Sequence, residues 1–154
     1  MKAILQRVSS ASIRVEGQEI ASIGPGILTL IGIQKGDTVK IAEKLIQKII
    51  QFRMFEDDTG KMNRSLLEIE GEHLIVSQFT LCADTEQGRR PSFVNAETPE
   101  KANALYEHAI QTSKALGVPT STGQFQANMQ IALVNEGPVT FSFELQAPSP
   151  QASL

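Results

Sequence analysis

The stretch ILTLIGI, residues 27–33, decides the fold of this chain. Nearly all of its residues are apolar, and polar and apolar side chains do not alternate along it. A strand covered on both faces has this pattern, whereas a strand with one face in water alternates. The sequence therefore predicts a central strand here, buried on both faces.

Further strands are predicted on both sides of this central strand, from short apolar runs bounded by Gly, Pro or polar turns. They are residues 3–8, 11–15, 20–23, 52–55, 74–81, 125–134 and 139–145. Within one of them, Ile13 and Val15 share a face while Arg14 points away, which is the period of two expected of a strand. The order of segments is therefore dominated by strands.

Two segments have apolar residues at helical spacing. The first is predicted to start with Asp37 as its N-cap, and its buried stripe is Ala42, Leu45, Ile46, Ile49 and Ile50. The second is predicted to start at Thr98 and Pro99 and to stop near Gly117. Neither helix fits a regular βαβ alternation, so the sequence favours an α+β fold with a mostly antiparallel, barrel-like sheet and two long helices.

Size and composition are those of a single globular domain. The chain has 154 residues, of which 41% are hydrophobic and 20% charged. No apolar run reaches the roughly 18 residues that would span a bilayer, and Arg7 and Arg14 interrupt the N-terminal apolar residues, unlike a signal peptide. We therefore expect a cytoplasmic protein without membrane contact, with a domain over residues 1–145 and a disordered tail over 146–154.

Several kinds of site have little support in the sequence. Cys82 is the only cysteine, and the two histidines, His73 and His108, lie far apart, so no metal site is predicted. The net charge of −3 argues against a broad electrostatic grip on nucleic acid. Local basic patches, either Arg89-Arg90 or the residues around Lys61 and Arg64, remain candidates beside the alternative of solvated surface charge.

A change of character at the end of one predicted strand is the first candidate for a site. The residues before Ser77 are apolar on both faces, and Ser77, Gln78 and Thr80 then follow. Polar groups at the end of a buried strand need partners or a ligand. Two interpretations are open, a strand running out into solvent or the edge of a pocket. Residues 82–97 form a long polar loop, and a long loop in a compact domain more often has a function than not.

Five short motifs together resemble D-aminoacyl-tRNA deacylase, over residues 1 to about 145. They are Gln6-Arg7-Val8, Gly60-Lys61-Met62-Asn63, Ser77-Gln78-Phe79-Thr80-Leu81 with Ala83-Asp84, Gly88-Arg89-Arg90-Pro91-Ser92-Phe93 and Asn135-Glu136-Gly137-Pro138-Val139-Thr140. Their order and spacing match the family. One departure is Gln126, where the family usually has Gly after the Phe, and it raises a question about the backbone beside the pocket.

The resemblance implies an enzyme that hydrolyses the ester joining a D-amino acid to the 3′-terminal adenosine of tRNA. It implies a homodimer with active sites at the interface, with tRNA as partner and no cofactor. One subunit contributes Ser77, Gln78, Phe79 and Thr80, and the other contributes a Gly137-cisPro138 dipeptide. The main chain of that dipeptide is expected to reject L-amino acids by steric exclusion. Glycine, which has no side chain, is expected as a second substrate, mischarged on tRNA-Ala.

The resemblance also implies a mechanism without a side-chain nucleophile. The ribose 2′-hydroxyl assists attack by water, and backbone N–H groups near Phe79 and Thr80 stabilise the oxyanion. Gln78 positions the substrate, Arg7 braces the pocket or the Gly-Pro loop, and Phe125 and Met129 contact adenine, core packing being the alternative for both. A Thr80 nucleophile ranks second, because neither a nearby base nor a Gly-x-Ser-x-Gly elbow is present. A non-catalytic tRNA- or protein-binding dimer and a generic Ser/Thr esterase remain alternatives.

Overall fold

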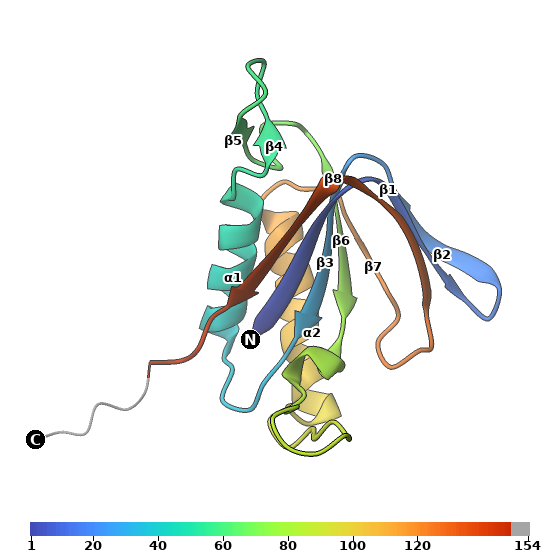
Figure 1. Cartoon of the computed structure of the whole chain (residues 1–154), viewed down its shortest axis with the longest axis vertical. Helices are drawn as coiled ribbons and strands as arrows, with labels where there is room; N and C mark the ends of the chain where they lie inside the picture. Colours follow the sequence, from blue (N-terminus) through green and yellow to red (C-terminus); the bar gives the residue numbers. More distant parts are fainter. Residues whose placement is uncertain (149–154) are drawn as a thin grey trace, which may run out of the picture.

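A computed structural model describes residues 1–148 of the chain, and Figure 1 shows its elements. In chain order they are β1 (Lys2–Val15), β2 (Gln18–Ile23), β3 (Gly26–Gly32), α1 (Val39–Gln51), β4 (Phe55–Glu56), β5 (Met62–Arg64), β6 (Glu72–Ser77), the 3-10 helix η1 (Phe79–Cys82), α2 (Pro99–Ala115), β7 (Thr120–Thr122) and β8 (Gln130–Glu144). Two long helices and a main sheet confirm the predicted α+β class.

Strand β3 occupies the middle of the main sheet, whose order is β2-β1-β3-β6-β7 with β8 on the other side of β1. All residues of β3 are buried except the half-buried Leu30, so the central strand is confirmed. Strand β1 pairs antiparallel with β2, β3 and β8. Strand β6 pairs parallel with both β3 and β7, so the mostly antiparallel sheet has one parallel edge.

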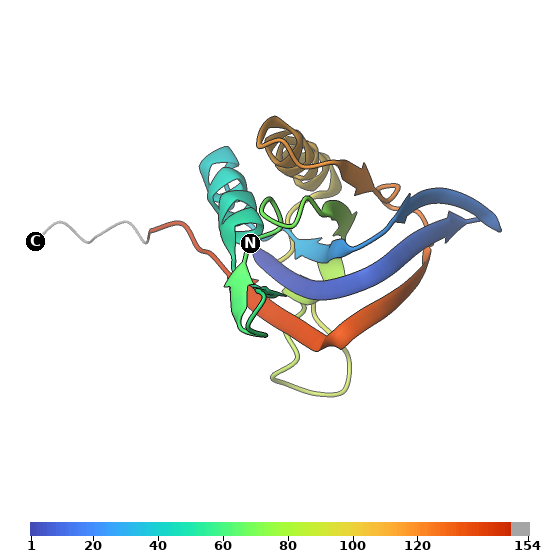
Figure 2. The ribbon, with the colours of Figure 1, turned by 90° about the horizontal axis from the view of Figure 1, so that it is seen from above.

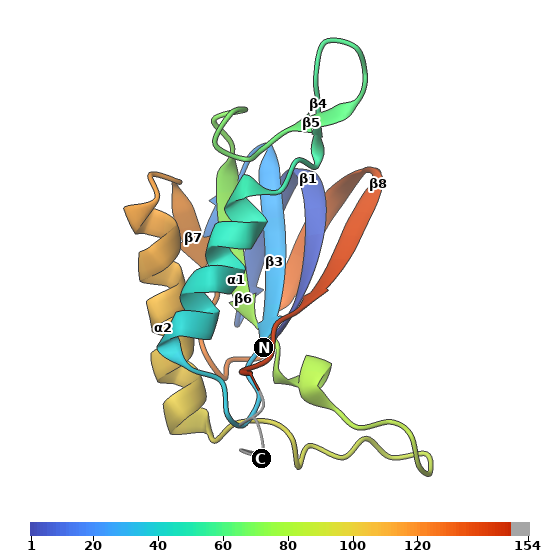
Figure 3. The same ribbon diagram turned by 90° about the vertical axis from the view of Figure 1, so that its left-hand side faces the viewer.

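Two apolar cores fill the two sides of the sheet. The helices α1 and α2 cover one side, as Figures 2 and 3 show. The predicted stripe of α1 is buried there together with Met54 and Tyr106. On the other side the curved strands enclose a smaller core that includes Val8, Ile13, Leu28 and Val76. The sheet thus closes most of the way into a barrel, and only one of its two cores depends on the helices.

Three strand predictions need correction. The segments 3–8 and 11–15 form one strand, β1, which bends where its register with β8 shifts near Val8. Likewise β8 is continuous from Gln130 to Glu144, and residues 125–129 before it form a turn. Strand β6 stops at Ser77 instead of continuing to residue 81. In each case the ends of the strand are set by pairing with a strand that is distant in sequence. The local sequence pattern does not predict that pairing.

Two smaller elements also differ from the prediction. Strand β4 covers Phe55–Glu56, so only one residue of the expected strand 52–55 belongs to it. The short strand β7, Thr120–Thr122, was not predicted. It has few residues and is held in the sheet by its pairing with β6, beside α2.

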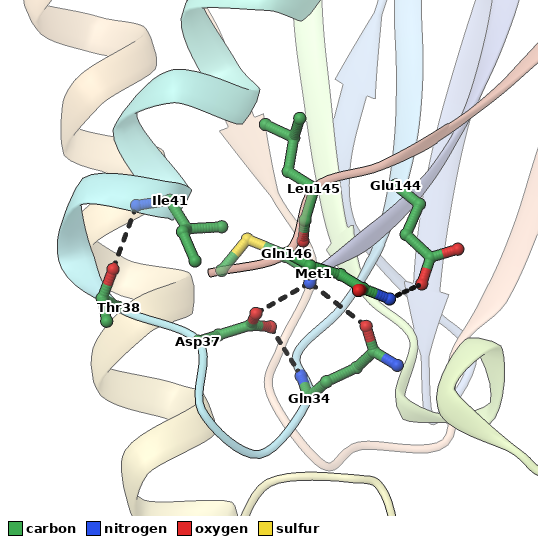
Figure 4. Close-up of polar contacts among 8 residues, drawn as sticks. All are labelled: Met1, Gln34, Asp37, Thr38, Ile41, Glu144, Leu145 and Gln146. Atoms are coloured by element: carbon green, nitrogen blue, oxygen red, sulfur yellow. Dashed lines mark hydrogen bonds and ion pairs between the residues drawn. The ribbon is translucent and has the colours of Figure 1, made fainter. Parts of the chain in front are cut away.

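Asp37 is not the N-cap of α1. Thr38 has that role, since its Oγ1 accepts a hydrogen bond from the Ile41 N–H at 3.3 Å. Asp37 instead binds the N-terminal amine of Met1, with Oδ1 2.8 Å from the nitrogen, as Figure 4 shows. The same amine donates to the Leu145 carbonyl at 2.7 Å and to Gln34 at 3.2 Å. These contacts join both ends of the described chain to the loop before α1.

Two further expectations from the sequence concern the C-terminal tail and contact with a membrane. Residues 145–148 have no regular secondary structure. Residues 149–154, most of the tail predicted to be disordered, lie outside the described residues. Among the helices of residues 1–148, none is long and apolar enough to cross a membrane.

Candidate active site

A cavity of about 570 Å³ lies where β6 ends. Part of the lining is Ser77, Gln78 and Phe79, and another part is the turn from Phe125 to Met129. Ala96, Glu97 and the first turn of α2 close a third side. Much of the lining is apolar, with polar groups where β6 stops.

The change from strand to 3-10 helix puts the polar residues of one wall in place. The N–H of Gln78 donates to the Ile31 carbonyl at 2.7 Å, a backbone hydrogen bond to β3 just past the end of β6. The chain then turns through η1 instead of continuing as the predicted strand. The Gln78 Nε2 donates to the Thr80 Oγ1 at 2.6 Å. The two side chains act as one polar unit at the end of β6.

Gly32 allows η1 to approach the sheet this closely. A Cβ built on Gly32 would lie 2.9 Å from the Leu81 Cβ, 3.0 Å from the Cys82 Sγ and 3.1 Å from the Gln78 carbonyl oxygen. A glycine within a strand often marks such a close approach. The position of the polar wall therefore depends on the absence of a side chain at residue 32.

The wall formed by residues 125–129 is a turn that packs on the core. The Phe125 ring packs on the Tyr106 ring, with centroids 5.9 Å apart. Tyr106 donates its hydroxyl to the Ile75 carbonyl at 2.8 Å, and burial raises the pKa of Tyr106 to about 12. The Met129 sulfur lies over Gly123, where an added Cβ would approach it to 2.6 Å. Phe125 and Met129 are both half-buried, so each packs inward and also faces the cavity.

The long loop after η1 borders the same cavity and extends from that end of the molecule (Figure 3). Its ends are joined by two hydrogen bonds between the backbones of Asp84 and Ser92. The rings of Phe79 and Phe93 lie 5.0 Å apart, although Phe79 is 57% exposed. An exposed aromatic pair beside a cavity is a surface on which a partner can pack.

The segment around Gly137 and Pro138 does not line this cavity. The peptide bond between them is cis, and Gly137 has φ 142°. The Arg7 Nε donates to the Glu136 carbonyl at 2.9 Å. Asn135 Oδ1 accepts from the Val139 N–H at 2.7 Å, closing the bend. Hydrogen bonds on both sides thus hold this exposed piece of main chain in position.

The structure places the predicted site residues in two groups. The group that lines the cavity is Ser77, Gln78, Phe79, Phe125 and Met129, and Thr80 lies next to it. Arg7, Gly137 and Pro138 lie outside the lining described for residues 1–148. Sequence reasoning missed Gly32, Gly123 and Tyr106, although a glycine inside the apolar run 27–33 was a usable signal.

Neither histidine is placed to activate a hydroxyl in the cavity. Both ring nitrogens of the fully buried His73 are used, by Thr29 Oγ1 at 2.7 Å and Ser113 Oγ at 3.0 Å. Burial lowers the pKa of His73 to about 3. His108 contacts Glu43 at 2.9 Å on the surface. Burial also raises the pKa of the Cys82 thiol, so neither the two histidines nor this thiol supplies the base or activated nucleophile that a generic esterase would use.

The candidate basic patch around Lys61 and Arg64 lies in a turn whose polar side chains partly pair with one another. The Arg64 guanidinium pairs with Asp58 at 3.0 Å, and Asn63 donates to Asp57 at 2.9 Å. Hydrogen bonds from Thr59 and Asn63 hold the pKa of Asp57 well below its usual range, so this turn stabilises itself. Within residues 1–148, no group of three His, Cys, Asp or Glu side chains is placed to hold a metal ion.

The profile of a known protein family, described as D-Tyr-tRNA(Tyr) deacylase, matches residues 4–144. The chain belongs to this family. The predicted family membership, and with it an enzyme of the deacylase class, is confirmed. One relative, a D-aminoacyl-tRNA deacylase of Geotalea uraniireducens (strain Rf4), is 52% identical over 144 residues, which cover 94% of this chain and 93% of that protein.

Solved structures show the same fold for this deacylase. A structure titled c-Myc DNA Unwinding Element Binding Protein is 39% identical, with a TM-score of 0.91, covering 96% of this chain and all of the other. A probable eukaryotic D-amino acid tRNA deacylase is 18% identical, with a TM-score of 0.81 over 94% of this chain and 98% of the other. At that identity the second likeness concerns the fold alone.

Proposed function

We propose that this protein hydrolyses the ester of D-aminoacyl-tRNA in the cavity beside β6. The observation that carries the proposal is the pairing of two walls. The polar end of β6, with Gln78 bound to Thr80, lines the same cavity as the apolar side chains of Phe125 and Met129. One wall suits a reacting ester and the other suits a nucleobase. The end of the substrate carries both groups, because its aminoacyl ester is attached to the terminal adenosine.

The adenine base is assigned to the wall formed by Phe125 and Met129. Unstacked bases of RNA ends bind on aromatic and apolar side chains. Both residues are half-buried and line the cavity, and the Tyr106 ring supports Phe125 from behind. Core packing and base contact are therefore compatible roles for these two side chains.

The ester is assigned to the start of η1. Phe79 and Thr80 are the first residues of this helix, and the first N–H groups of a helix have no partner within it. They are suitable donors to the oxyanion that forms when water attacks the ester carbonyl. The water oxygen forms the new bond to the carbonyl carbon, the bond to the ribose 3′-oxygen breaks, and the neighbouring 2′-hydroxyl relays the proton to that oxygen. No side-chain nucleophile is needed.

Selection of the D-form is assigned to the main chain of Gly137 and Pro138 of a second copy. In one chain these residues lie outside the cavity lining described for residues 1–148, and they are exposed. Arg7 and Asn135 hold the segment by hydrogen bonds. Main chain fixed in this way cannot rotate aside, so it excludes an L side chain while leaving space for a D side chain. A homodimer with two shared sites follows from this assignment.

Other properties follow from the same proposal. Glycine has no side chain to exclude, so glycyl-tRNA mischarged on tRNA-Ala is a second substrate. The role is proofreading of aminoacyl-tRNA, which places the protein in the cytoplasm with tRNA as partner and no cofactor.

A purely nucleic-acid-binding role has weaker support, because the net charge is −3 and the basic side chain of Arg64 is paired with Asp58.

One assay tests the proposal against its alternatives. The protein is incubated with D-Tyr-tRNA and with L-Tyr-tRNA, and release of the amino acid is followed over time. Release from the D form alone is the expected result. Equal release from both forms would indicate an unselective esterase, and no release would indicate a non-catalytic binding protein. Light scattering of the same sample tests the dimer, for which a monomer mass would contradict the shared site.

A further inference from the structure

Gln126 has a backbone conformation that side-chain-bearing residues avoid. Its φ is 65°, in the left-handed region, where the Cβ crowds the following carbonyl oxygen. Two other non-glycine residues of the described chain share this feature, Glu16 and Glu70. Neither of those lines the cavity, whereas Gln126 does. A strained residue at a ligand site is a reason to ask what its side chain contributes.

The local turn does not itself require glutamine. The N–H of Ala127 donates to the Gln124 carbonyl at 3.1 Å, which closes a four-residue turn with Gln126 at its third position. A positive φ at that position favours glycine. A glycine would therefore form the same turn without strain, and local structure gives no reason for the side chain.

The carboxamide of Gln126 is free to bind a ligand. The residue is exposed at the rim of the cavity, beside the half-buried Phe125 and Met129. Among residues 1–148 no protein group hydrogen-bonds its side chain. An unpaired carboxamide next to an apolar wall offers a donor and an acceptor in one plane.

We propose that Gln126 reads the edge of the terminal adenine by hydrogen bonds from its side-chain carboxamide. This inference rests on the proposed function and deepens it. A Gln side chain pairs with adenine by two hydrogen bonds, accepting from the N6 amino group and donating to N7. Phe125 and Met129 supply contact with the face of any base, but they do not distinguish one base from another. Gln126 supplies that distinction.

The experiment compares two substrates and four forms of the enzyme, one of which is a control variant. The substrates are D-Tyr-tRNA ending in adenosine and the same tRNA ending in purine riboside, which lacks the N6 amino group. The enzymes are the wild type, Gln126→Gly and Gln126→Ala. Both variants lose the carboxamide, but only Gln126→Gly relieves the backbone strain caused by the positive φ at residue 126. Gln124→Ala is the matched control, because Gln124 is an exposed glutamine of the same turn outside the cavity lining.

The wild type and Gln124→Ala are expected to prefer adenosine by about tenfold in kcat/KM, an effect typical of one well-placed amide–base pair. Both Gln126 variants are expected to lose that preference, through a higher KM for the adenosine substrate with kcat little changed. Gln126→Gly alone is expected to melt at a higher temperature than the wild type. If the variants keep the wild-type preference, the inference is overturned.

A binding measurement separates this inference from the proposed function. Calorimetry uses a non-hydrolysable 3′-amide analogue, D-tyrosylamino-adenosine, and its purine riboside counterpart. A preference for the adenosine analogue that vanishes in Gln126→Gly supports adenine reading even if no ester is hydrolysed. Equal binding of both analogues by the wild type would contradict adenine reading even if D-Tyr-tRNA is hydrolysed.

Discussion

The Nε of Arg7 donates a hydrogen bond to the backbone carbonyl of Glu136 at 2.9 Å, across 129 positions of sequence. The same guanidinium donates through Nη1 to the Met54 carbonyl at 3.0 Å, and Arg7 is 8% exposed. One buried cation therefore joins β1, the segment before β4 and the middle of β8. The position of the main chain at Gly137 depends on it.

Replacing Arg7 by Gln is expected to lower the free energy of unfolding by about 2–3 kcal/mol, because the buried Met54 carbonyl and the Glu136 carbonyl lose a charged donor. Urea denaturation measures this change. If the proposed function is correct, discrimination between D-Tyr-tRNA and L-Tyr-tRNA falls as well, because Gly137 loses its support. Glu56→Gln is the control, since Glu56 is 56% exposed and 4.0 Å from the guanidinium, and it should change stability little. Equal effects of both variants would contradict the role of the two hydrogen bonds.

Adding a methyl group at Gly32 is expected to move η1 away from β3. The new Cβ would lie within about 3 Å of Leu81, Cys82 and the Gln78 carbonyl. Gly32→Ala should cost about 1–3 kcal/mol of stability and lower kcat/KM for D-Tyr-tRNA at temperatures where the variant is fully folded. Gly24→Ala is matched to it, because its nearest contact is an ordinary 3.5 Å. A folded Gly32→Ala protein with wild-type activity would show that the position of η1 does not matter.

His73 is expected to make the protein less stable in acid. Burial lowers its pKa from 6.5 to about 3 in the folded protein, while the unfolded chain takes up the proton near the ordinary value. Between these two pH values the unfolded state binds more protons, so the free energy of unfolding falls as the pH drops. The slope attributable to one such group is about 1.4 kcal/mol per pH unit, and the contribution is complete above pH 6.5.

Urea denaturation at several pH values from 5 to 7 checks this dependence. His73→Gln should be less stable overall, because the hydrogen bonds to Thr29 and Ser113 change, yet its stability should vary less with pH. His108→Gln, which removes a half-exposed imidazole beside Glu43, is the control. The prediction fails if His73→Gln and the wild type have the same slope between pH 5 and 6.5.

Removing the Thr80 hydroxyl is expected to leave most of the activity. The backbone N–H groups of Phe79 and Thr80 remain in Thr80→Ala, and only the contact with Gln78 is lost. We expect kcat/KM for D-Tyr-tRNA to fall by less than about tenfold, against 100-fold or more for loss of an oxyanion donor. Thr80→Val keeps the shape without the hydroxyl and should behave alike. Near-total loss in both variants, with thermal melting unchanged, would favour a side-chain mechanism instead.

Much of the fold could be read from local pattern. The apolar run around residues 27–33 and the stripe from Ala42 to Ile50 depend on neighbours in sequence, and both lie buried as predicted. The start of α2 at Pro99 was equally local. The end of β6 at Ser77 and the continuity of β1 through Val8, in contrast, depend on pairing with residues far along the chain. Asp37 resembled an N-cap, but the amine of Met1 binds its carboxylate in the folded chain.

The candidate site likewise has features that the sequence identifies and features that only the structure shows. The motif Ser77 to Thr80 and the dipeptide Gly137-Pro138 could be identified from sequence through their resemblance to a known family. Only the structure showed that Phe125 and Met129 line one cavity together with the end of β6, or that Gln126 lies there with a left-handed backbone.

The sequence by itself therefore determined the two helices, the buried central strand and the motifs, because periodicity and residue type act over a few neighbouring positions. Only the tertiary structure decided where strands end, which glycines admit a close neighbour and which motifs share a cavity. Those properties depend on the packing of segments distant in sequence, such as Gly32 against Cys82 and Arg7 against Glu136. Packing of this kind is set by the shape and hydrogen bonding of the whole core, to which local pattern gives no access.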